Sequence, residues 1–295
     1  MNAGRVKPQP LVQREPAALI TGAAGGIGVA LCETFEAAGY RVIGLDRVSV
    51  NMDRFVLCDL QRFVTESTYR REISEEILDH LPRVDVDMDS GSGSASASAS
   101  ASASASASGL GVGADSGNRS SGRALTALVN NAAVQVLGGV ADFSAHDWQV
   151  TLNVNLVAPA LLCQSLLAAL EAGKGSVVNV GSIHAHLTKA GFVAYATSKA
   201  ALLGLTRAMA VDLGGRVRVN AVAPAATATP MLEEGFAGRP EARAELDVAH
   251  PIGRIATPAE VAEVVRFLAS PEASFISGAT VAIDGAMGAR LHDPV

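Results

Sequence analysis

Short apolar runs alternate along this 295-residue chain with longer stretches in which apolar residues recur every three or four positions. A short apolar run is typical of a buried strand, whereas the longer period is typical of a helix with one face in the core. The runs predict strands over 17–21, 41–45, 54–58, 124–129, 176–180, 217–221 and 280–283. The longer period predicts helices over about 26–38, 62–80, 147–171, 192–213 and 258–269.

Strands that alternate with helices predict an α/β fold with right-handed crossovers. Strands that are continuously apolar, without polar alternation, indicate a parallel sheet covered on both faces. We therefore expect a Rossmann-like, doubly wound parallel sheet of about seven strands flanked by helices. Residues 1–16 are expected to form a flexible leader, and residues 17–295 a single domain.

Residues 82–123 follow neither pattern, and their centre, residues 91–113, is almost wholly Ser, Ala and Gly. Such side chains bury little apolar area, which favours a flexible segment, although alternating Ser and Ala could also pair as a strand. Because the strand–helix alternation resumes afterwards, we interpret the segment as a loop insertion. It enters between a helix and a strand, which predicts a position at the N-terminal edge of the sheet, away from the edge that binds ligands.

The glycine-rich stretch TGAAGGIG, residues 21–28, joins the first predicted strand to the first predicted helix. In that context Gly22 permits a tight turn, Gly26 lets the backbone approach a pyrophosphate, and Gly28 lets the helix pack close to the strand. The free N–H groups of the helix N-terminus would then face the phosphates. The alternative interpretation is an ordinary glycine-rich turn.

Asp46 ends the second predicted strand, where a dinucleotide site places an acidic residue. A carboxylate there can accept hydrogen bonds from both adenosine ribose hydroxyls and repels a 2′-phosphate, which favours NAD over NADP. Arg47 opposes this preference, because a guanidinium can bind that phosphate. Asp59, after the third predicted strand, is a second candidate cofactor contact, and it is also a candidate helix N-cap.

Tyr195 and Lys199 lie four residues apart on one predicted helix and therefore share a face. A nearby ammonium is expected to lower the pKa of the phenol, giving a group that exchanges a proton with an alcohol or ketone. Ser182, just past the strand over 176–180, could hydrogen-bond the substrate oxygen. Taken alone, Tyr-x-x-x-Lys is more often a surface pair and a serine after a strand more often a cap.

In their order and spacing these motifs resemble the short-chain dehydrogenase/reductase family, compact single-domain branch. The resemblance extends to Asn-Asn-Ala-Ala at 130–133, to the helix that carries Asn155, and to the segment 218–231. The chain departs from the family pattern at Ala133, Ala225, Thr227 and Ala286. Asn155 could otherwise be a buried structural amide, and the turn at Pro224 an ordinary one.

The resemblance implies a catalytic set of Asn155, Ser182, Tyr195 and Lys199. Hydride would move between the nicotinamide and a carbinol carbon, Tyr195 would transfer the proton, and Ser182 would orient the substrate oxygen. Lys199 would lower the tyrosine pKa and hold the nicotinamide ribose, and Asn155 would position a relay water. The implied cofactor contacts are Thr21, Gly22, Gly26, Ile27, Gly28, Asp46, Arg47, Asp59, Leu60, Asn131, Ala132, Tyr195, Lys199, Pro224, Thr227 and Thr229.

His184, in the sequence His-Ala-His after Ser182, is a candidate substrate-pocket residue. Two alternating histidines without a third ligand do not make a metal site, and we expect none. Residues 231–249 are expected to form a mobile helical lid. Two other functions remain: a non-catalytic redox sensor on the same fold, and an epimerase or dehydratase of nucleotide sugars. The glycine spacing and the short segment after Lys199 disfavour the epimerase.

Composition narrows the partners. The net charge of −6, with no basic cluster, disfavours nucleic acid, and no apolar run is long enough to span a membrane. Cys32, Cys58 and Cys163 lie far apart in apolar stretches, which predicts reduced, buried thiols, and the first 16 residues lack a secretory pattern. We therefore expect a cytoplasmic protein. Leucines on more than one face of the helices over 147–171 and 192–213 predict a dimer or tetramer.

Overall fold

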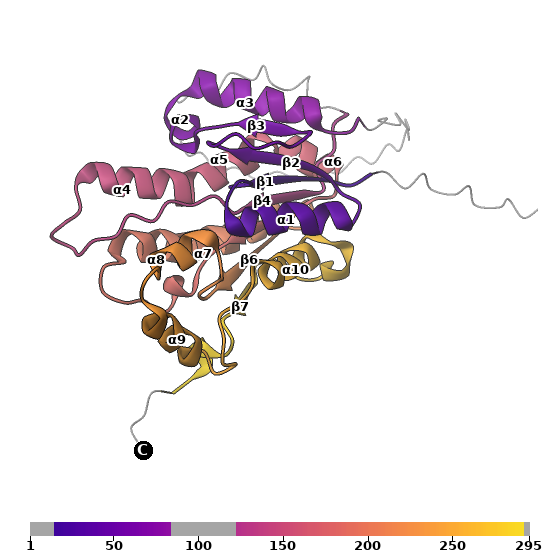
Figure 1. Ribbon diagram of the computed structural model, residues 1–295. Coiled ribbons are helices and arrows are strands. Elements are labelled where there is room, and N and C mark those ends of the chain that lie inside the picture. The colour runs from indigo at the N-terminus through magenta and orange to yellow at the C-terminus, as the bar shows by residue number, and fades with distance from the viewer. Residues whose placement is uncertain (1–14, 84–121, 292–295) are drawn as a thin grey trace, which may run out of the picture.

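Seven parallel strands form one sheet in a computed structural model that describes residues 15–83 and 122–291 (Figure 1). The order across the sheet is β3-β2-β1-β4-β5-β6-β7, so the chain starts in the middle and winds outward in both directions. The strands are β1 (Ala17–Thr21), β2 (Arg41–Asp46), β3 (Phe55–Leu57), β4 (Ala127–Asn130), β5 (Ser176–Val180), β6 (Arg218–Pro224) and β7 (Thr280–Ile283). The predicted doubly wound α/β fold is confirmed.

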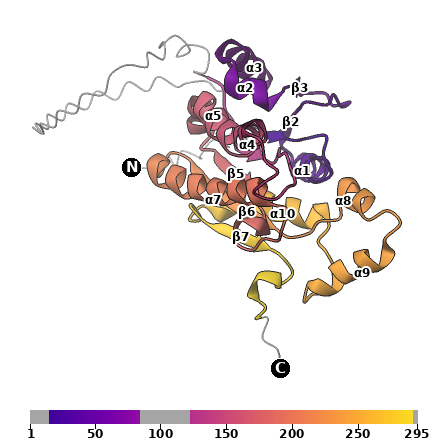
Figure 2. The ribbon, with the colours of Figure 1, turned by 90° about the vertical axis from the view of Figure 1, so that its left-hand side faces the viewer.

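The two faces of the sheet pack against different helices. Successive residues of β1 alternate between them, with Leu19 in one hydrophobic cluster and Ala18 and Ile20 in the other. The Leu19 cluster also takes in residues of α3, α5, α6 and α7, whereas the Ile20 cluster takes in α1 and α10. In Figure 2, α4, α5 and α7 lie on one side of the sheet and α1 and α10 on the other. Burial on both sides explains why the strands read as continuous apolar runs.

The helices are α1 (Gly26–Ala37), α2 (Leu60–Thr65), α3 (Ser67–His80), α4 (Ala145–Leu152), α5 (Ala158–Ser165), α6 (Leu167–Ala172), α7 (Val193–Leu213), α8 (Pro230–Gly235), α9 (Pro240–Ala249) and α10 (Pro258–Ala269). The helix predicted over 258–269 is confirmed in full, because Thr257 and Glu260 form a capping box and Pro258 occupies the first turn. The stretch predicted as a lid contains two helices, α8 and α9, which extend away from the main body (Figure 2).

Two predicted helices are wrong as continuous elements. The helix over 62–80 is two helices, because Glu66 between them adopts an extended backbone, with φ −115° and ψ 103°. The helix over 147–171 is divided twice, by a π-turn over Asn153–Val157 and by a break at Leu166. The apolar spacing continues across all three interruptions, so the sequence pattern did not indicate them. Three short 3₁₀ turns complete the elements, at Ile183–Ala185, Pro271–Ala273 and Met287–Ala289.

Most of the predicted insertion, residues 84–121, lies outside the described residues. Its described ends meet: Arg83 and Arg123 form an antiparallel bridge, and the Ala124 N–H donates to the Pro82 carbonyl at 3.2 Å. The Arg123 guanidinium also donates to the Leu81 carbonyl at 2.7 Å. Because β4 begins at Ala127, this junction stands at the N-terminal edge of the sheet, where the insertion was expected to enter.

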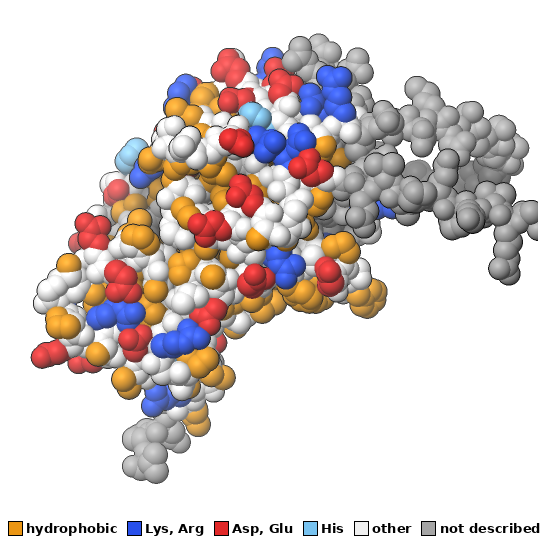
Figure 3. Space-filling model, turned by 45° about the vertical axis from the view of Figure 1, so that its right-hand side comes forward, with side chains coloured by type: hydrophobic (Ala, Val, Ile, Leu, Met, Phe, Trp, Pro, Cys, Tyr) orange, Lys and Arg blue, Asp and Glu red, His pale blue; other side chains and the backbone are white. Residues whose placement is uncertain are grey.

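The three cysteines are buried free thiols, as predicted. Burial raises the pKa of Cys32 and Cys58 to about 12 and that of Cys163 to about 11, so the thiols stay protonated and unreactive at neutral pH. On the face drawn in Figure 3, acidic and basic side chains are interspersed among apolar ones. Within residues 15–83 and 122–291, no helix has the length and apolar character needed to cross a membrane.

Candidate active site

The carboxyl ends of parallel strands meet at one edge of the sheet, and the candidate residues follow those ends. Gly22 comes after β1, Asp46 ends β2, Asn131 follows β4, Ser182 follows β5, and Pro224 ends β6. Strand order places β1 between β2 and β4, at the point where the winding direction changes. In open α/β sheets ligands bind in the crevice at this switch point.

The glycine loop leads by a tight turn from β1 into α1. Gly22 has φ +70°, which favours glycine, and a Cβ on Gly28 would stand 1.9 Å from the Gly22 carbonyl oxygen. A Cβ on Gly26 would stand 2.9 Å from both Thr229 and Pro230, so the start of α8 faces the loop closely. No side chain caps the first turn of α1. Its N–H groups and the positive end of the helix dipole therefore suit the phosphates of a dinucleotide.

Thr21 and Asn131 hold this loop against β4 rather than projecting toward a ligand. Thr21 is buried, and its hydroxyl accepts hydrogen bonds from the Asn131 and Ala132 N–H groups, each at 3.0 Å. The Asn131 amide donates to the Thr21 and Gly22 carbonyls at 3.0 and 3.2 Å. Thr21 and Asn131 thus fix the shape of the glycine loop, while their contact with a cofactor stays a prediction.

The Asp46 carboxylate braces the loop on the other side. Its Oδ2 accepts from the Ala24 N–H at 3.0 Å and its Oδ1 from the Val48 N–H at 3.1 Å. Each carboxylate oxygen accepts two or more hydrogen bonds, so the group keeps capacity for ribose hydroxyls. Arg47 is exposed beside it. A negative charge and a positive charge therefore stand together where the adenosine ribose would bind.

Asp59 acts as a helix cap. Its Oδ1 accepts from the Gln61 N–H at 2.8 Å and from the Arg62 N–H at 3.4 Å, at the start of α2. This confirms the N-cap interpretation, while contact with an adenine stays a prediction. Leu60, the next residue, is buried at 8% exposure and anchors α2 to the core.

Tyr195 and Lys199 project from the first turns of α7 toward Ser182. The Lys199 Nζ lies 5.8 Å from the centre of the Tyr195 ring and donates to the Val180 carbonyl at 2.8 Å. Lys199 is 2% exposed, and its burial lowers the pKa of the ammonium to about 8. Tyr195 hydrogen-bonds the Ser182 side chain, which acts to lower the tyrosine pKa.

The prediction that the pKa of Tyr195 is lowered is wrong. Burial raises the pKa of the phenol above its ordinary value, and this outweighs the Ser182 hydrogen bond. Tyr195 is therefore a protonated phenol at neutral pH, ready to donate its proton. Ser182 is itself held, because its Oγ accepts from the His184 N–H at 3.2 Å.

Asn155 lies in the π-turn, and its side chain is fully engaged. Its Nδ2 donates to the Val134 carbonyl at 2.9 Å and to the Ser198 Oγ at 3.0 Å, while its Oδ1 accepts from the Val134 N–H at 2.8 Å. Pro159 follows four residues later and has no N–H. The Asn155 carbonyl therefore cannot receive the usual α-helical hydrogen bond.

His184 forms part of an aromatic wall beside Tyr195. Its ring stacks on Phe192 with centroids 4.2 Å apart and lies edge-on to Tyr195 at 5.9 Å. Burial, aided by Lys189, lowers the pKa of His184, so its ring is neutral at pH 7. Phe192 was not among the candidates from the sequence. No group of three or more His, Cys, Asp or Glu side chains in the described parts of the chain could hold a metal ion.

The segment after β6 runs over the site and into α8 and α9. Thr227 is buried and pairs with Ala256 in a parallel bridge, and the Thr229 hydroxyl caps α8 by accepting from the Leu232 N–H at 3.3 Å. The start of α8 therefore has a fixed place opposite Gly26. Pro224 ends β6 and Thr227 and Thr229 lie on this segment, while their contact with a nicotinamide stays a prediction.

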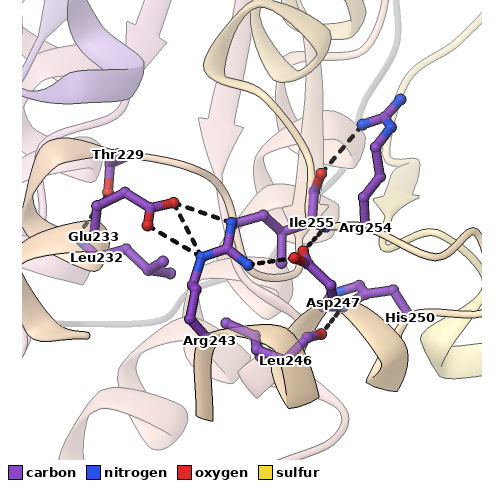
Figure 4. A network of polar contacts seen from close by, with 9 residues as sticks. All are labelled: Thr229, Leu232, Glu233, Arg243, Leu246, Asp247, His250, Arg254 and Ile255. Atoms are coloured by element: carbon purple, nitrogen blue, oxygen red, sulfur yellow. Dashed lines mark hydrogen bonds and ion pairs between the residues drawn. The ribbon is translucent and has the colours of Figure 1, made fainter. Parts of the chain in front are cut away.

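Figure 4 shows the polar network that joins α8 and α9 to the body. Arg243 binds Glu233 of α8 at 3.1 Å and Asp247 of α9 at 2.8 Å. Asp247 also accepts from the Ile255 N–H at 3.0 Å. A cavity of about 310 Å³ lies beside this network, lined by residues that include His250 and Asp284. Tyr195 and Ser182 do not line it, so it is separate from the proton-transfer site.

Sequence reasoning missed two groups that complete the site. Val134 and Ser198 fix Asn155, and both were invisible because nothing in a one-dimensional pattern brings 134, 155 and 198 together. The sequence held one indication of the role of Ser198. It directly precedes Lys199 in Tyr-Ala-Thr-Ser-Lys, residues 195–199, and the structure buries both side chains.

Two family models match the chain. One, described as enoyl-(acyl carrier protein) reductase, matches residues 118–287, and the NAD dependent epimerase/dehydratase family matches residues 18–105. The chain is 42% identical over 171 residues to 2-(S)-hydroxypropyl-CoM dehydrogenase 3 of Xanthobacter autotrophicus, covering 56% of this chain and 67% of that protein. It is 35% identical over 277 residues to Protein FixR of Bradyrhizobium diazoefficiens, covering 90% of this chain and 84% of that protein.

A solved structure has a similar fold. The ligand-free aldohexose dehydrogenase of Thermoplasma acidophilum superposes with a TM-score of 0.74 at 26% sequence identity, covering 96% of this chain and 97% of that chain. The similarity thus extends over nearly the whole length of both chains.

Proposed function

The chain belongs to the short-chain dehydrogenase/reductase family, and we propose that it transfers a hydride between NAD(H) and a secondary alcohol or ketone. One observation carries the proposal: the buried Lys199 Nζ lies 5.8 Å from the centre of the Tyr195 ring and donates to the Val180 carbonyl, two residues before the buried Ser182. A phenol gathered with a buried hydroxyl and a buried ammonium gives the groups needed to move a proton at a carbonyl oxygen.

The residues present fit a dinucleotide. The glycine loop provides the uncapped N-terminus of α1, Asp46 stands at the ribose end, and Pro224, Thr227 and Thr229 stand on the segment that would face the nicotinamide. A bound nicotinamide supplies or takes up the hydride. The chain's own residues do the remainder, which is to bind the dinucleotide, to hold the substrate oxygen and to move the proton.

Ketone reduction follows from the protonation states. The Ser182 hydroxyl orients the substrate oxygen, and the Tyr195 phenol donates its proton to that oxygen as negative charge develops there. The Lys199 ammonium stabilises the phenolate that remains, because the two groups are close and the Lys199 side chain is shielded from water. In alcohol oxidation the same proton moves back to Tyr195.

We assign the relay water to the backbone carbonyl of Asn155 and not to its amide. The amide has both N–H groups engaged, whereas the carbonyl lacks its α-helical donor. The side chain thus holds the π-turn in place, and the main chain provides the acceptor.

A non-catalytic NAD-binding sensor is the alternative on this fold. Such a protein has no need of a lysine ammonium buried at 2% exposure next to a tyrosine and a serine. Burying an ammonium lowers the stability of the fold unless the charge is paired, so its presence here favours a role for the charge in the site. We therefore retain the enzyme as the proposal.

Tyr195→Phe tests the function. This substitution removes one oxygen and keeps the ring, so the fold and NADH affinity should stay within a few-fold of wild type. General acid–base catalysis is worth about 10²–10⁴-fold, so kcat should fall by at least about 100-fold. The measurement is NADH absorbance with a panel of ketones and secondary alcohols. A variant that kept more than about a tenth of the wild-type kcat would favour the sensor.

We also propose a dimer or tetramer. Part of the leucine set on the helices faces the core, with Leu162, Leu166, Leu202 and Leu203 at 2% exposure or less. Leu161, Leu167 and Leu205 remain partly exposed, and Val211 at the end of α7 is 84% exposed. A second copy would cover these side chains. Light scattering at micromolar concentration measures the assembly directly.

A further inference from the structure

A buried hydroxyl joins the catalytic helix to the π-turn. Ser198 is 0% exposed and lies directly before Lys199 on α7. Its Oγ donates to the Tyr195 carbonyl at 2.7 Å and accepts from the Asn155 Nδ2 at 3.0 Å. One hydroxyl therefore bonds two residues of the predicted catalytic set, through the backbone of one and the side chain of the other.

The amide of Asn155 extends this contact to a third element. Besides Ser198, it binds the Val134 carbonyl and N–H, at 2.9 and 2.8 Å, in the segment after β4. That segment continues to Gly138, which pairs with Phe192 at the start of α7. The first turn of α7 is thus fastened at two points, by the pairing at Phe192 and by Ser198.

Under the proposed function, the hydrogen bonds of Ser198 affect the reaction rate, because proton transfer depends on where the Tyr195 phenol lies. Building on that function, we infer that Ser198 is a positioning residue: it locks the backbone of Tyr195 to Asn155, and so keeps the phenol against Ser182. Ser198 does not touch the reacting atoms. Its effect passes through the Tyr195 backbone and through the Asn155 amide.

The same helix offers a matched control. Thr206 is also 0% exposed, its Oγ1 donates to the Leu202 carbonyl at 2.8 Å, and it accepts from the Asn179 Nδ2 at 2.9 Å. Ser198 and Thr206 therefore make the same pair of hydrogen bonds, to a helical carbonyl and from a buried asparagine. Only the Ser198 pair holds Asn155 and Tyr195.

The experiment compares Ser198→Ala with Thr206→Val in steady-state kinetics and thermal melting. Both variants remove one buried hydroxyl and should lower Tm by similar amounts. Misplacing a reacting group by about 1 Å costs up to about 100-fold in rate. We therefore expect kcat of Ser198→Ala to fall about 10- to 100-fold with KM values within threefold, and Thr206→Val to keep kcat within about threefold.

A second readout needs no substrate. The chain has three tyrosines, so ¹³C-labelled tyrosine gives a simple NMR spectrum in which Tyr195→Phe assigns the Tyr195 signal. We expect the ring signal of Tyr195 to shift or broaden at neutral pH in Ser198→Ala and to stay in place in Thr206→Val. Ser198→Cys, which nearly preserves volume and hydrogen-bonds weakly, should give a smaller change in the same direction.

Equal losses of kcat in Ser198→Ala and Thr206→Val, or an unmoved Tyr195 signal, would overturn the inference. If Ser198→Ala does not fold, Ser198→Cys decides by the same two readouts. A Tyr195→Phe variant with full activity would instead remove the proposed function, and the NMR comparison would still show whether Ser198 holds Tyr195.

Discussion

Lys199 carries its charge where a charge is hard to keep. Its ammonium donates to the Val180 carbonyl, and burial lowers the pKa of Lys199 to about 8. A lysine with a lowered pKa is charged below that value and neutral above it. The charge that we propose stabilises a Tyr195 phenolate is therefore present at neutral pH and lost in mild alkali, long before the phenol itself ionises.

We predict that kcat for ketone reduction falls as the pH rises through about 8. The measurement is kcat between pH 6 and 10 with cofactor and substrate saturating. Lys199→Arg keeps a charge throughout this range, because guanidinium titrates above about 12. Its profile should be lower but flat across pH 8. An inflection that persisted in the arginine variant would belong to another group.

Asp46 contributes both a negative charge and hydrogen bonds that hold the loop, and one substitution can remove the two effects together. We propose that it repels a 2′-phosphate, and it also accepts from the Ala24 and Val48 N–H groups that shape the loop. Asp46→Ala removes both effects. Asp46→Asn removes the charge and keeps a carbonyl acceptor, so it isolates the electrostatic part.

The wild type should prefer NAD by kcat/KM, and Asp46→Asn should narrow that preference by about tenfold, which corresponds to about 1.4 kcal/mol. Asp46→Ala should narrow or reverse it, because Arg47 then faces the phosphate unopposed. Both cofactors are compared at one ionic strength, since these exposed charges are screened by salt. A wild-type enzyme with the higher kcat/KM for NADP would contradict the assignment.

At the scale of elements, the apolar runs predicted the position of every described strand. A strand that is buried on both faces has apolar residues at successive positions, and this pattern is visible in the sequence. Three of the seven, β1, β5 and β7, begin and end at the predicted residues. Helix interruptions were not predictable in the same way. The break at Glu66 and the π-turn at Asn153–Val157 leave the apolar spacing intact, since both sides of each break still cover the same core.

The same distinction applies to the candidate site, where features within one element were predictable and contacts between elements were not. Spacing put Tyr195 and Lys199 on one face of a helix, and Ser182 was expected just after β5; the structure has both placements, while the catalytic roles stay a prediction. Contacts between elements could not be located, because they depend on how α7 and the π-turn pack. The bonds of Asn155 to Val134 and Ser198 are of this kind, as is the raised pKa of Tyr195, which reflects burial.

At the scale of the whole molecule, the parallel topology separates two edges of the sheet. The glycine loop, Ser182 and Pro224 follow the carboxyl ends of their strands, while the Arg83–Arg123 junction stands where β4 begins. Substitutions at one edge are thus remote from the chemistry at the other. This separation makes the role of the Ser/Ala/Gly insertion open to a direct test.

Deleting residues 90–118 and joining the ends with a short Gly-Ser link should leave kcat and folding nearly unchanged. The junction is held by contacts outside the deleted stretch: the Arg83–Arg123 bridge, the Ala124–Pro82 hydrogen bond and the ion pair of Arg123 with Asp79 at 3.2 Å. Loop length also has a small thermodynamic effect, about 0.6 kcal/mol per doubling. Thermal melting, light scattering and kcat are measured for both proteins. A large loss of kcat with an unchanged Tm would place the insertion at the active site, and a change in mass would place it at a subunit contact.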